Sequence, residues 1–144
     1  MKYHFDTSLG RISLQISRAL GRSFESRARQ KVEKIRADQW SVISLLYHKG
    51  AQTQKGISDS LFMDKVAVSR LIDRLEKADL VRREKVPADK RANTVSLTIE
   101  GNRMYGLMEP LAREAIGEAL KGMTLDETES LFRTLDRIKK NLRC

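Results

Sequence analysis

Three observations predict a mainly α-helical (α+β) fold. Apolar residues recur every three or four positions over most of the 144 residues, which is the spacing of one helical face. Strand-like alternation replaces this spacing only between residues 80 and 98. The two prolines are too few to break the pattern, and the length suits one domain. We therefore expect a single domain over residues 1–144, in the order helix, helix, helix, helix, hairpin, helix, helix.

The first predicted helix is unusually long and runs from Ser8 to Ile35. Apolar residues form one face of it, at Leu9, Ile12, Ile16, Leu20, Phe24, Ala28, Val32 and Ile35. The other face is basic, because residues 1–36 hold nine basic and three acidic residues, a net charge of +6. A lone helix of this length must pack on something, and the remaining chain offers little cover. A second subunit is therefore the expected cover.

Three shorter helices should follow. The helix over residues 37–48 ends before a glycine C-cap and buries Trp40, Ile43, Leu46 and Tyr47. The helix over residues 53–61 leads into a tight turn, with Asp64 as the N-cap of the next helix. That fourth helix, residues 65–78, has an apolar side made of Val68, Leu71, Ile72 and Leu75. Its other side carries Lys65, Ser69, Arg70, Arg74 and Lys77, and must face solvent or a ligand.

A β-hairpin and two helices complete the predicted fold. Two β-rich runs, Val81 to Val86 and Asn93 to Thr98, flank a polar connection over residues 87–92. Thr98 is the expected N-cap of the fifth helix, which Pro110 should kink by removing a backbone donor. A capping box over residues 124–127 opens the last helix. The apolar face of that helix consists of Leu131, Phe132, Leu135, Ile138 and Leu142.

This order of elements indicates a winged helix-turn-helix. In that arrangement two short helices are joined by a tight turn, the second enters the DNA major groove, and a hairpin flanks it. The helix over residues 65–78 has the required apolar side and polar, basic side. The alternative is an ordinary amphipathic helix with a solvated charged face.

Several runs of residues resemble the MarR family of bacterial and archaeal transcription regulators. These are TQKGISDSL at 53–61, DKVAVSRLIDRLE at 64–76 and LVRR at 80–83. The wing signature of the family is similar to DKRA at 89–92, followed by a strand that ends in Leu97 and Thr98 before Gly101. Ala78 and Asp79 replace the usual basic–Gly pair, and Asp tolerates the left-handed conformation that such a turn needs.

The resemblance implies a winged helix-turn-helix with long N- and C-terminal dimerisation helices. Residues 1–36 and 102–144 would form a homodimer, and residues 37–101 a DNA-binding lobe with the helix-turn-helix at about 53–77 and the wing at about 80–98. Two lobes would bind a pseudo-palindromic operator in double-stranded DNA. The residues that match DNA-binding positions are Lys65, Val66, Ala67, Ser69, Arg70, Arg74, Lys90 and Arg91. Asp89 matches the acid that orients the wing-tip Arg91, and a turn-stabilising ion pair between the two is the alternative.

The resemblance also implies a repressor that a small molecule releases from DNA. Family members commonly bind a small, often aromatic, anionic effector between the dimerisation helices and the DNA-binding lobe. Trp40, Tyr47, Met104, Tyr105 and Met108 could line such a cavity, with Arg18 or Arg22 placed to pair a carboxylate. The alternative for the apolar members of this set is plain core.

Composition agrees with a polyanion as partner. Lys and Arg number 28 against 19 Asp and Glu, which gives a net charge of +9. The longest uncharged stretch, residues 39–48, has ten residues, whereas a membrane span needs about 20 apolar ones. The N-terminus lacks an apolar core of signal-peptide length. We therefore expect no membrane partner and a cytoplasmic location.

Metal, cofactor and enzyme classes are not expected. One cysteine, Cys144, and two histidines, His4 and His48, cannot supply an intramolecular disulfide or a four-ligand Cys/His cage. The sequence has no Gly-rich phosphate loop and no nucleophile beside a histidine. The main competing function is a winged-helix protein-interaction module without DNA binding, which the basic helix argues against.

Overall fold

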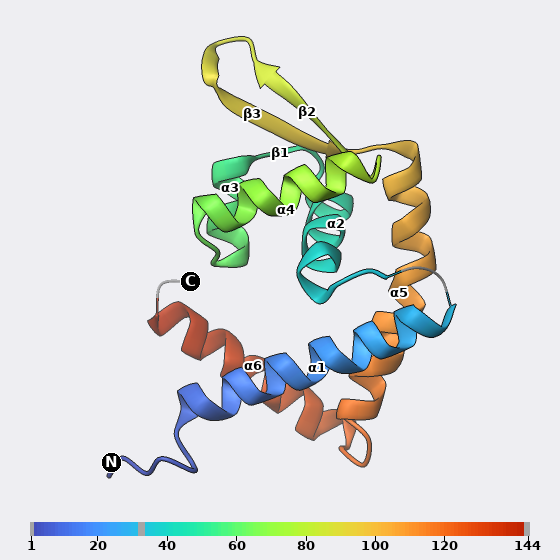
Figure 1. Ribbon diagram of the computed structural model, residues 1–144. Coiled ribbons are helices and arrows are strands. Elements are labelled where there is room, and N and C mark those ends of the chain that lie inside the picture. Colours follow the sequence, from blue (N-terminus) through green and yellow to red (C-terminus); the bar gives the residue numbers. More distant parts are fainter. Residues whose placement is uncertain (1, 32–33, 143–144) are drawn as a thin grey trace.

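The computed structural model describes residues 2–31 and 34–142 and confirms the mainly α (α+β) fold (Figure 1). A lobe of short elements carries a β-hairpin that projects from one end, and longer helices gather at the other end. The elements are α1 (Leu9–Lys31), α2 (Ala37–Lys49), β1 (Gln52–Thr53), α3 (Gln54–Leu61), α4 (Lys65–Lys77), β2 (Val81–Val86), β3 (Asp89–Leu97), α5 (Ile99–Ala119) and α6 (Leu125–Asn141). No helix among the described residues is long and apolar enough to cross a membrane.

The sheet has three antiparallel strands in the order β1-β3-β2. The two-residue β1 was not expected from the sequence, and its Gln52 pairs with Val95 of β3. The predicted connection over residues 87–92 was too long, because β3 already begins at Asp89. The register shifts between Lys85, which pairs with Asn93, and Val86, which pairs with Asp89. A bulge near the tip therefore absorbs the polar residues that looked like a loop.

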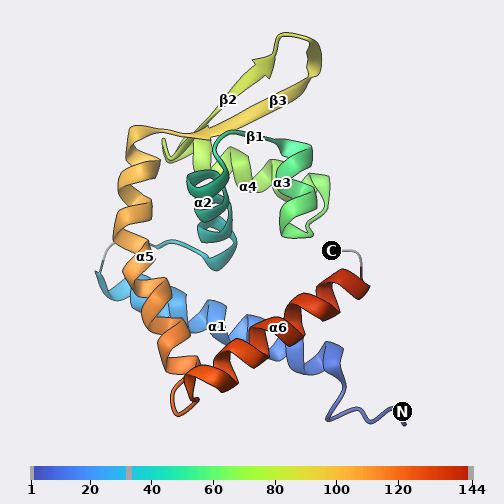
Figure 2. The ribbon, with the colours of Figure 1, turned by 180° about the vertical axis from the view of Figure 1, so that it is seen from behind.

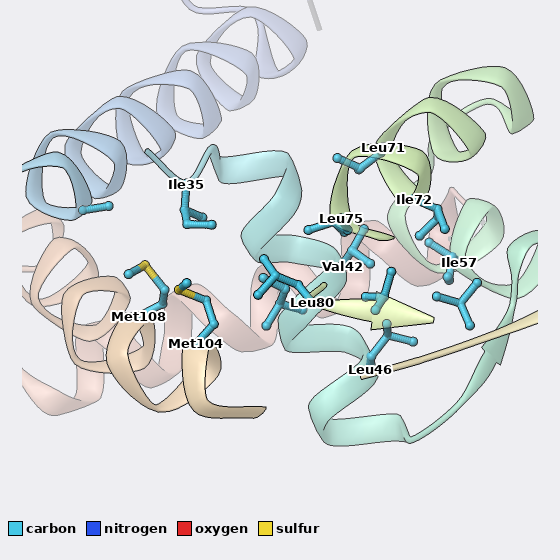
Figure 3. Packing of buried hydrophobic residues seen from close by; sticks show 14 of the residues in the cluster. Ile35, Val42, Leu46, Ile57, Leu71, Ile72, Leu75, Leu80, Met104 and Met108 are labelled. Carbon is cyan, nitrogen blue, oxygen red and sulfur yellow. The ribbon is translucent and has the colours of Figure 1, made fainter. Parts of the chain in front are cut away.

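The core joins α2, α3, α4 and the hairpin to α5. Figure 3 shows Leu71, Ile72 and Leu75 of α4 gathered with Val42 of α2 and Ile57 of α3. The buried side of α4 is the predicted one, and its four members are Val68, Leu71, Ile72 and Leu75. Burying a side chain of this size contributes roughly 1.5–3 kcal/mol, so this core fixes which side of α4 faces outward.

Side-chain caps set where several helices begin. Asp64 Oδ1 accepts a 2.8 Å hydrogen bond from the Ala67 backbone N–H, as predicted for the start of α4. Thr98 and Thr124 cap α5 and α6, also as predicted. Asp79, which follows α4, has φ of +59° and so adopts the left-handed conformation that the sequence predicted for this turn. These local signals were readable because each depends on neighbours in the sequence.

Two predictions about the N-terminal half were wrong. The first helix was expected to reach Ile35, but residues 34–36 lie outside any helix. Ile35 is buried in the connection, and Arg36 has the extended backbone of the N-cap of α2. Tyr47 was expected in the core, but its side chain is 48% exposed, and Val42 takes the buried position on α2 instead. Residues 32 and 33 of the predicted helix lie outside the described residues.

The long helices carry apolar side chains that this chain does not cover. α5 changes direction along its length, as expected for a helix with Pro110 inside it (Figure 2). α6 has no buried residue at all. The exposed apolar side chains of α1 and α6 are Leu9, Ile12, Leu14, Ile16, Leu125, Leu131, Phe132 and Leu135. An amphipathic helix with its apolar side in water lacks the packing that normally stabilises it.

Candidate nucleic-acid interface

The outward side of α4 carries most of the predicted DNA-binding residues. Lys65, Val66, Arg70 and Arg74 are exposed, opposite the buried side of the helix. Ala67 and Ser69 are half-buried at the edge of this surface. The N-terminal half of α4 is therefore an accessible, basic helical surface beside the hairpin (Figure 1).

A cleft of about 490 Å³ separates α4 from the hairpin. Its lining comes from the N-terminus of α3, from α4 and from β3, and comprises Thr53, Gln54, Lys55, Lys65, Ser69, Asp89, Ala92 and Asn93. Two lysines and several hydroxyl and amide groups line this space, and groups of this kind contact phosphate oxygens in protein–DNA complexes. The cleft places the predicted contacts Lys65 and Ser69 opposite the wing residue Asp89.

Arg83 of β2 joins the hairpin to α4 and α3. Its Nη1 lies 2.6 Å from Asp73 Oδ1 and 3.2 Å from Glu76 Oε1, both on α4. Its Nη2 donates to the Ser69 carbonyl at 3.1 Å, and its Nε donates to Gln54 Oε1 at 3.0 Å. Only 18% of the Arg83 side chain is exposed. One guanidinium thus ties the wing to the recognition helix and to the start of α3.

This network also changes the charge of the candidate interface. Asp73 and Glu76 are the two carboxylates of α4, and both would repel a phosphate backbone. Arg83 pairs with both of them, and its backbone N–H donates to Glu76 Oε2 at 3.1 Å. The exposed lysines and arginines of α4 are then less opposed by negative charge.

Arg83 lies in the LVRR run at residues 80–83, but no role for it was predicted from the sequence. Alternation along β2 was the available signal, because Arg83 lies two positions after the buried Val81 and so shares its inward-facing side. An arginine on the inward side of a strand needs acidic or carbonyl partners. Which helix would supply those partners depended on the packing of the lobe.

The wing residues lie on β3. Asp89 begins that strand and lines the cleft beside α4. Lys90 and Arg91 follow it in β3, but their side chains lie outside the described part of the structure.

A second, smaller cavity lies between α1, α2 and α5. Its volume is about 250 Å³ and its lining includes Ser17, Leu20, Gly21, Phe24, Ala37, Trp40, Ser41, Ala112, Ala115 and Ile116. Of the predicted effector-binding residues, Trp40 alone is among these lining residues. Arg18 and Arg22 are exposed and adjoin two lining residues in the sequence. Met104 and Met108 are buried in the core.

The remaining predicted effector residues belong to an aromatic stack. The Tyr105 ring lies 5.3 Å from that of Trp40 and 3.6 Å from that of Tyr47, measured between centroids, and is close to parallel with both. The Tyr105 hydroxyl and His48 Nε2 form a 3.0 Å hydrogen bond. Burial raises the pKa of Tyr105 above its usual value, with smaller contributions from Glu109 and Tyr47. The stack links α5 to α2 at the edge of the cavity.

Metal ligands do not gather in the described part of the chain, where no group of three or more His, Cys, Asp or Glu residues could hold an ion. Cys144 lies outside the described residues.

The lobe formed by α2 to β3 defines a winged helix-turn-helix protein, with α4 as its recognition helix. The model of the MarR family matches residues 35–92. The HTH-type transcriptional regulator MhqR of Bacillus subtilis is 26% identical over 133 residues, which cover 91% of each chain. A crystal structure of a mutant MarR from E. coli complexed with operator DNA is similar with a TM-score of 0.81 and 26% identity, over 90% of this chain and 92% of that chain. Residues 35–92 thus form a domain of the MarR family, and the chain shares the fold of the E. coli regulator over most of its length.

A further solved structure extends the likeness of fold to nearly the whole chain. BpsR of Bordetella bronchiseptica, whose DNA binding is described as regulated by 6-hydroxynicotinic acid, has a TM-score of 0.83. It covers 96% of this chain and 98% of its own, at 23% identity. The arrangement of long helices around a winged lobe is therefore shared beyond residues 35–92.

Proposed function

We propose that this protein is a sequence-specific, double-stranded DNA-binding transcriptional regulator that acts as a homodimeric repressor. The proposal rests on the exposed basic side of α4, which lies beside the wing. Arg83 of the wing holds the two elements together through its contacts with α4. A helix held in this way can enter a major groove while the hairpin follows the flanking backbone. The relative MarR, whose structure is described as complexed with operator DNA, supports the same use of this fold.

The proposal divides the DNA contacts by position. Lys65, Ser69 and Arg74 would contact phosphates, and Val66, Ala67 and Arg70 would face base edges in the major groove. On the wing, Arg91 would enter the minor groove and Lys90 would contact phosphate, with Asp89 orienting the arginine. Arginine suits a narrow minor groove because such a groove has an enhanced negative potential.

Dimerisation would cover the apolar sides of α1 and α6. Phe132 is 55% exposed and Leu135 is 41% exposed, although both belong to the apolar face of α6. A second copy offers the same unsatisfied surface and would bury both, with residues 1–36 and 102–144 as dimerisation helices and 37–101 as the DNA-binding lobe. Two recognition helices related by twofold symmetry would then require a pseudo-palindromic operator. A folded monomer at micromolar concentration would contradict this arrangement.

A small effector would act through the cavity between α1, α2 and α5. The cavity has an aromatic wall formed by Phe24 and Trp40, and a volume of about 250 Å³ suits a single aromatic ring. Arg18 or Arg22 would pair with an anionic substituent of that ring. Because α2 leads directly into β1, a shift of α2 would reach the sheet that carries the wing. Regulation of BpsR by an aromatic carboxylic acid is in keeping with this class of effector.

A gel-shift titration against salt tests the DNA-binding proposal. Each phosphate contact releases counterions, so the logarithm of the affinity should fall linearly with the logarithm of salt concentration, with a slope of about −0.9 per contact. Steep salt dependence with preference for one duplex supports a DNA-binding regulator. Failure to bind any duplex at low salt would instead favour a winged-helix protein-interaction module without DNA binding.

A further inference from the structure

Val66 occupies an unusual place for an apolar residue. Among the residues of α4, all of which the structure describes, it is the one large apolar side chain that is exposed, with 61% of its surface accessible. It lies about 160° around the helix from the buried Val68. Its neighbours on this surface are the exposed cations Lys65 and Arg70. Val66 therefore lies on the outward side of the first turn of the recognition helix.

Neither the core nor the helix explains this valine. The core already uses the four apolar positions on the other side of α4. In an exposed helical position, valine is less favourable than alanine because its branched side chain loses rotamer freedom. The cap of α4 depends on Asp64 and the backbone of Ala67, not on the side chain of Val66. The valine thus lowers the stability of the free protein and leaves apolar surface in water.

We infer that Val66 reads a thymine by contact with its 5-methyl group. This inference rests on the proposed function, in which α4 lies in a major groove. The thymine methyl is the one apolar group that base pairs present in that groove, and small apolar side chains recognise it by contact. Val66 can reach this methyl group because the proposed phosphate contacts of Lys65 and Arg74 would hold the helix in the groove. Val66 is therefore a specificity-determining residue.

Arg70 gives this contact a position in the operator. Val66 and Arg70 are four residues apart, so their side chains lie on the same side of α4, about 6 Å apart along its axis. Arginine pairs best with the O6 and N7 atoms of guanine. Because base pairs are about 3.4 Å apart, the thymine read by Val66 should lie within about two base pairs of the guanine read by Arg70.

Replacement of thymine by deoxyuridine tests the inference, because it removes only the methyl group. The probe is the duplex that the wild-type protein recovers from a random-sequence pool, with each thymine replaced in turn by deoxyuridine. Loss of one buried methyl contact, worth about 0.8 kcal/mol, corresponds to an affinity about fourfold lower. We expect this loss for the wild type at one thymine per half-site and expect no such loss for the Val66→Ala variant, which retains the helix.

The matched control is Ile99→Ala at the start of α5. Ile99 is 92% exposed, so this variant removes more apolar surface but lies outside α4. It should retain the wild-type response to deoxyuridine. The inference is overturned if the wild type tolerates deoxyuridine at every position, or if Val66→Ala loses affinity at the same position as the wild type. Absence of binding to any duplex would overturn the proposed function as well.

Discussion

Arg83 Nη1 of the wing lies 2.6 Å from Asp73 Oδ1 of the recognition helix. The same guanidinium donates to the Ser69 carbonyl and to Gln54 Oε1, so it holds the wing, α4 and the start of α3 in one arrangement. A cation with several fixed partners and little exposure positions the two elements that we propose contact DNA, α4 and the wing, relative to each other. This relationship makes Arg83 a positioning residue for an interface that it need not contact.

Arg83→Ala should therefore reduce both stability and DNA affinity. The variant leaves Asp73 and Glu76 without their cation, and the loss of charged hydrogen bonds should lower the free energy of unfolding by about 1.5–3 kcal/mol. DNA affinity should fall roughly tenfold, the effect of about 1.4 kcal/mol. Arg82→Ala is the matched control, because Arg82 has 66% of its side chain exposed and pairs with Glu84 on the same strand. Equal losses in the two variants, measured by denaturation and gel shift, would contradict the positioning role.

The two predicted arginine contacts should fail in different ways. Arg70→Ala, on the exposed side of α4, should cost roughly 1–3 kcal/mol and relax the preference at one base pair. Arg91→Ala should weaken binding to most sequences and reduce the slope of the salt dependence by about one. Any sequence preference that Arg91 provides should be limited to A·T-rich flanks, where the minor groove is narrow. If Arg91→Ala leaves affinity and salt slope unchanged in a folded dimer, the arginine belongs to a structural pair with Asp89.

Gly101 should not tolerate any side chain. A Cβ built at this position would lie 2.0 Å from the backbone oxygen of Leu80, at the close approach of α5 to the start of the wing. Gly101→Ala should lower the free energy of unfolding by about 3 kcal/mol, because backbone must move. Gly106→Ala, in the same helix with open space around it, should raise stability by about 0.5–1 kcal/mol. Thermal unfolding measures both, and similar behaviour of the two variants would refute the close packing.

Alkaline pH should destabilise the protein through Tyr105. Burial raises the pKa of this phenol above its usual value of 10.0, so the neutral form is favoured in the folded state. The corresponding stability is complete below pH 10 and is lost as the pH rises through the higher folded pKa. In thermal melts between pH 8 and 11, the wild type should lose more stability than Tyr105→Phe, which retains the ring stack. A parallel fall in both proteins would show that Tyr105 does not contribute.

Much of the lobe was predictable because its signals are local. The buried side of α4, the Asp64 cap and the left-handed Asp79 each follow from a few neighbouring residues. The hairpin was predicted with the wrong loop, because the bulge between Lys85 and Val86 depends on cross-strand pairing. Tyr47 was misplaced because its stack with Tyr105 joins residues far apart in the sequence.

The candidate interface was predictable in the same uneven way. The basic side of α4 could be read from helical spacing, whereas the partners of Arg83 come from two other elements and could not. The effector-binding set was implied by the family resemblance, and the helical spacing of its aromatic and methionine residues does not distinguish a core from a cavity wall. Trp40 lines the cavity, but Met108 is fully buried in the core.

Selection of DNA from a random-sequence pool by the purified wild-type protein tests the central claim most directly. Two symmetric recognition helices predict enrichment of an inverted repeat whose half-sites are about one helical turn, 10 to 10.5 base pairs, apart. Each half-site should contain a guanine with a thymine close by. A pool that stays random after repeated rounds at low salt, or that enriches only a single unpaired half-site, would contradict a dimer that presents α4 to successive major grooves.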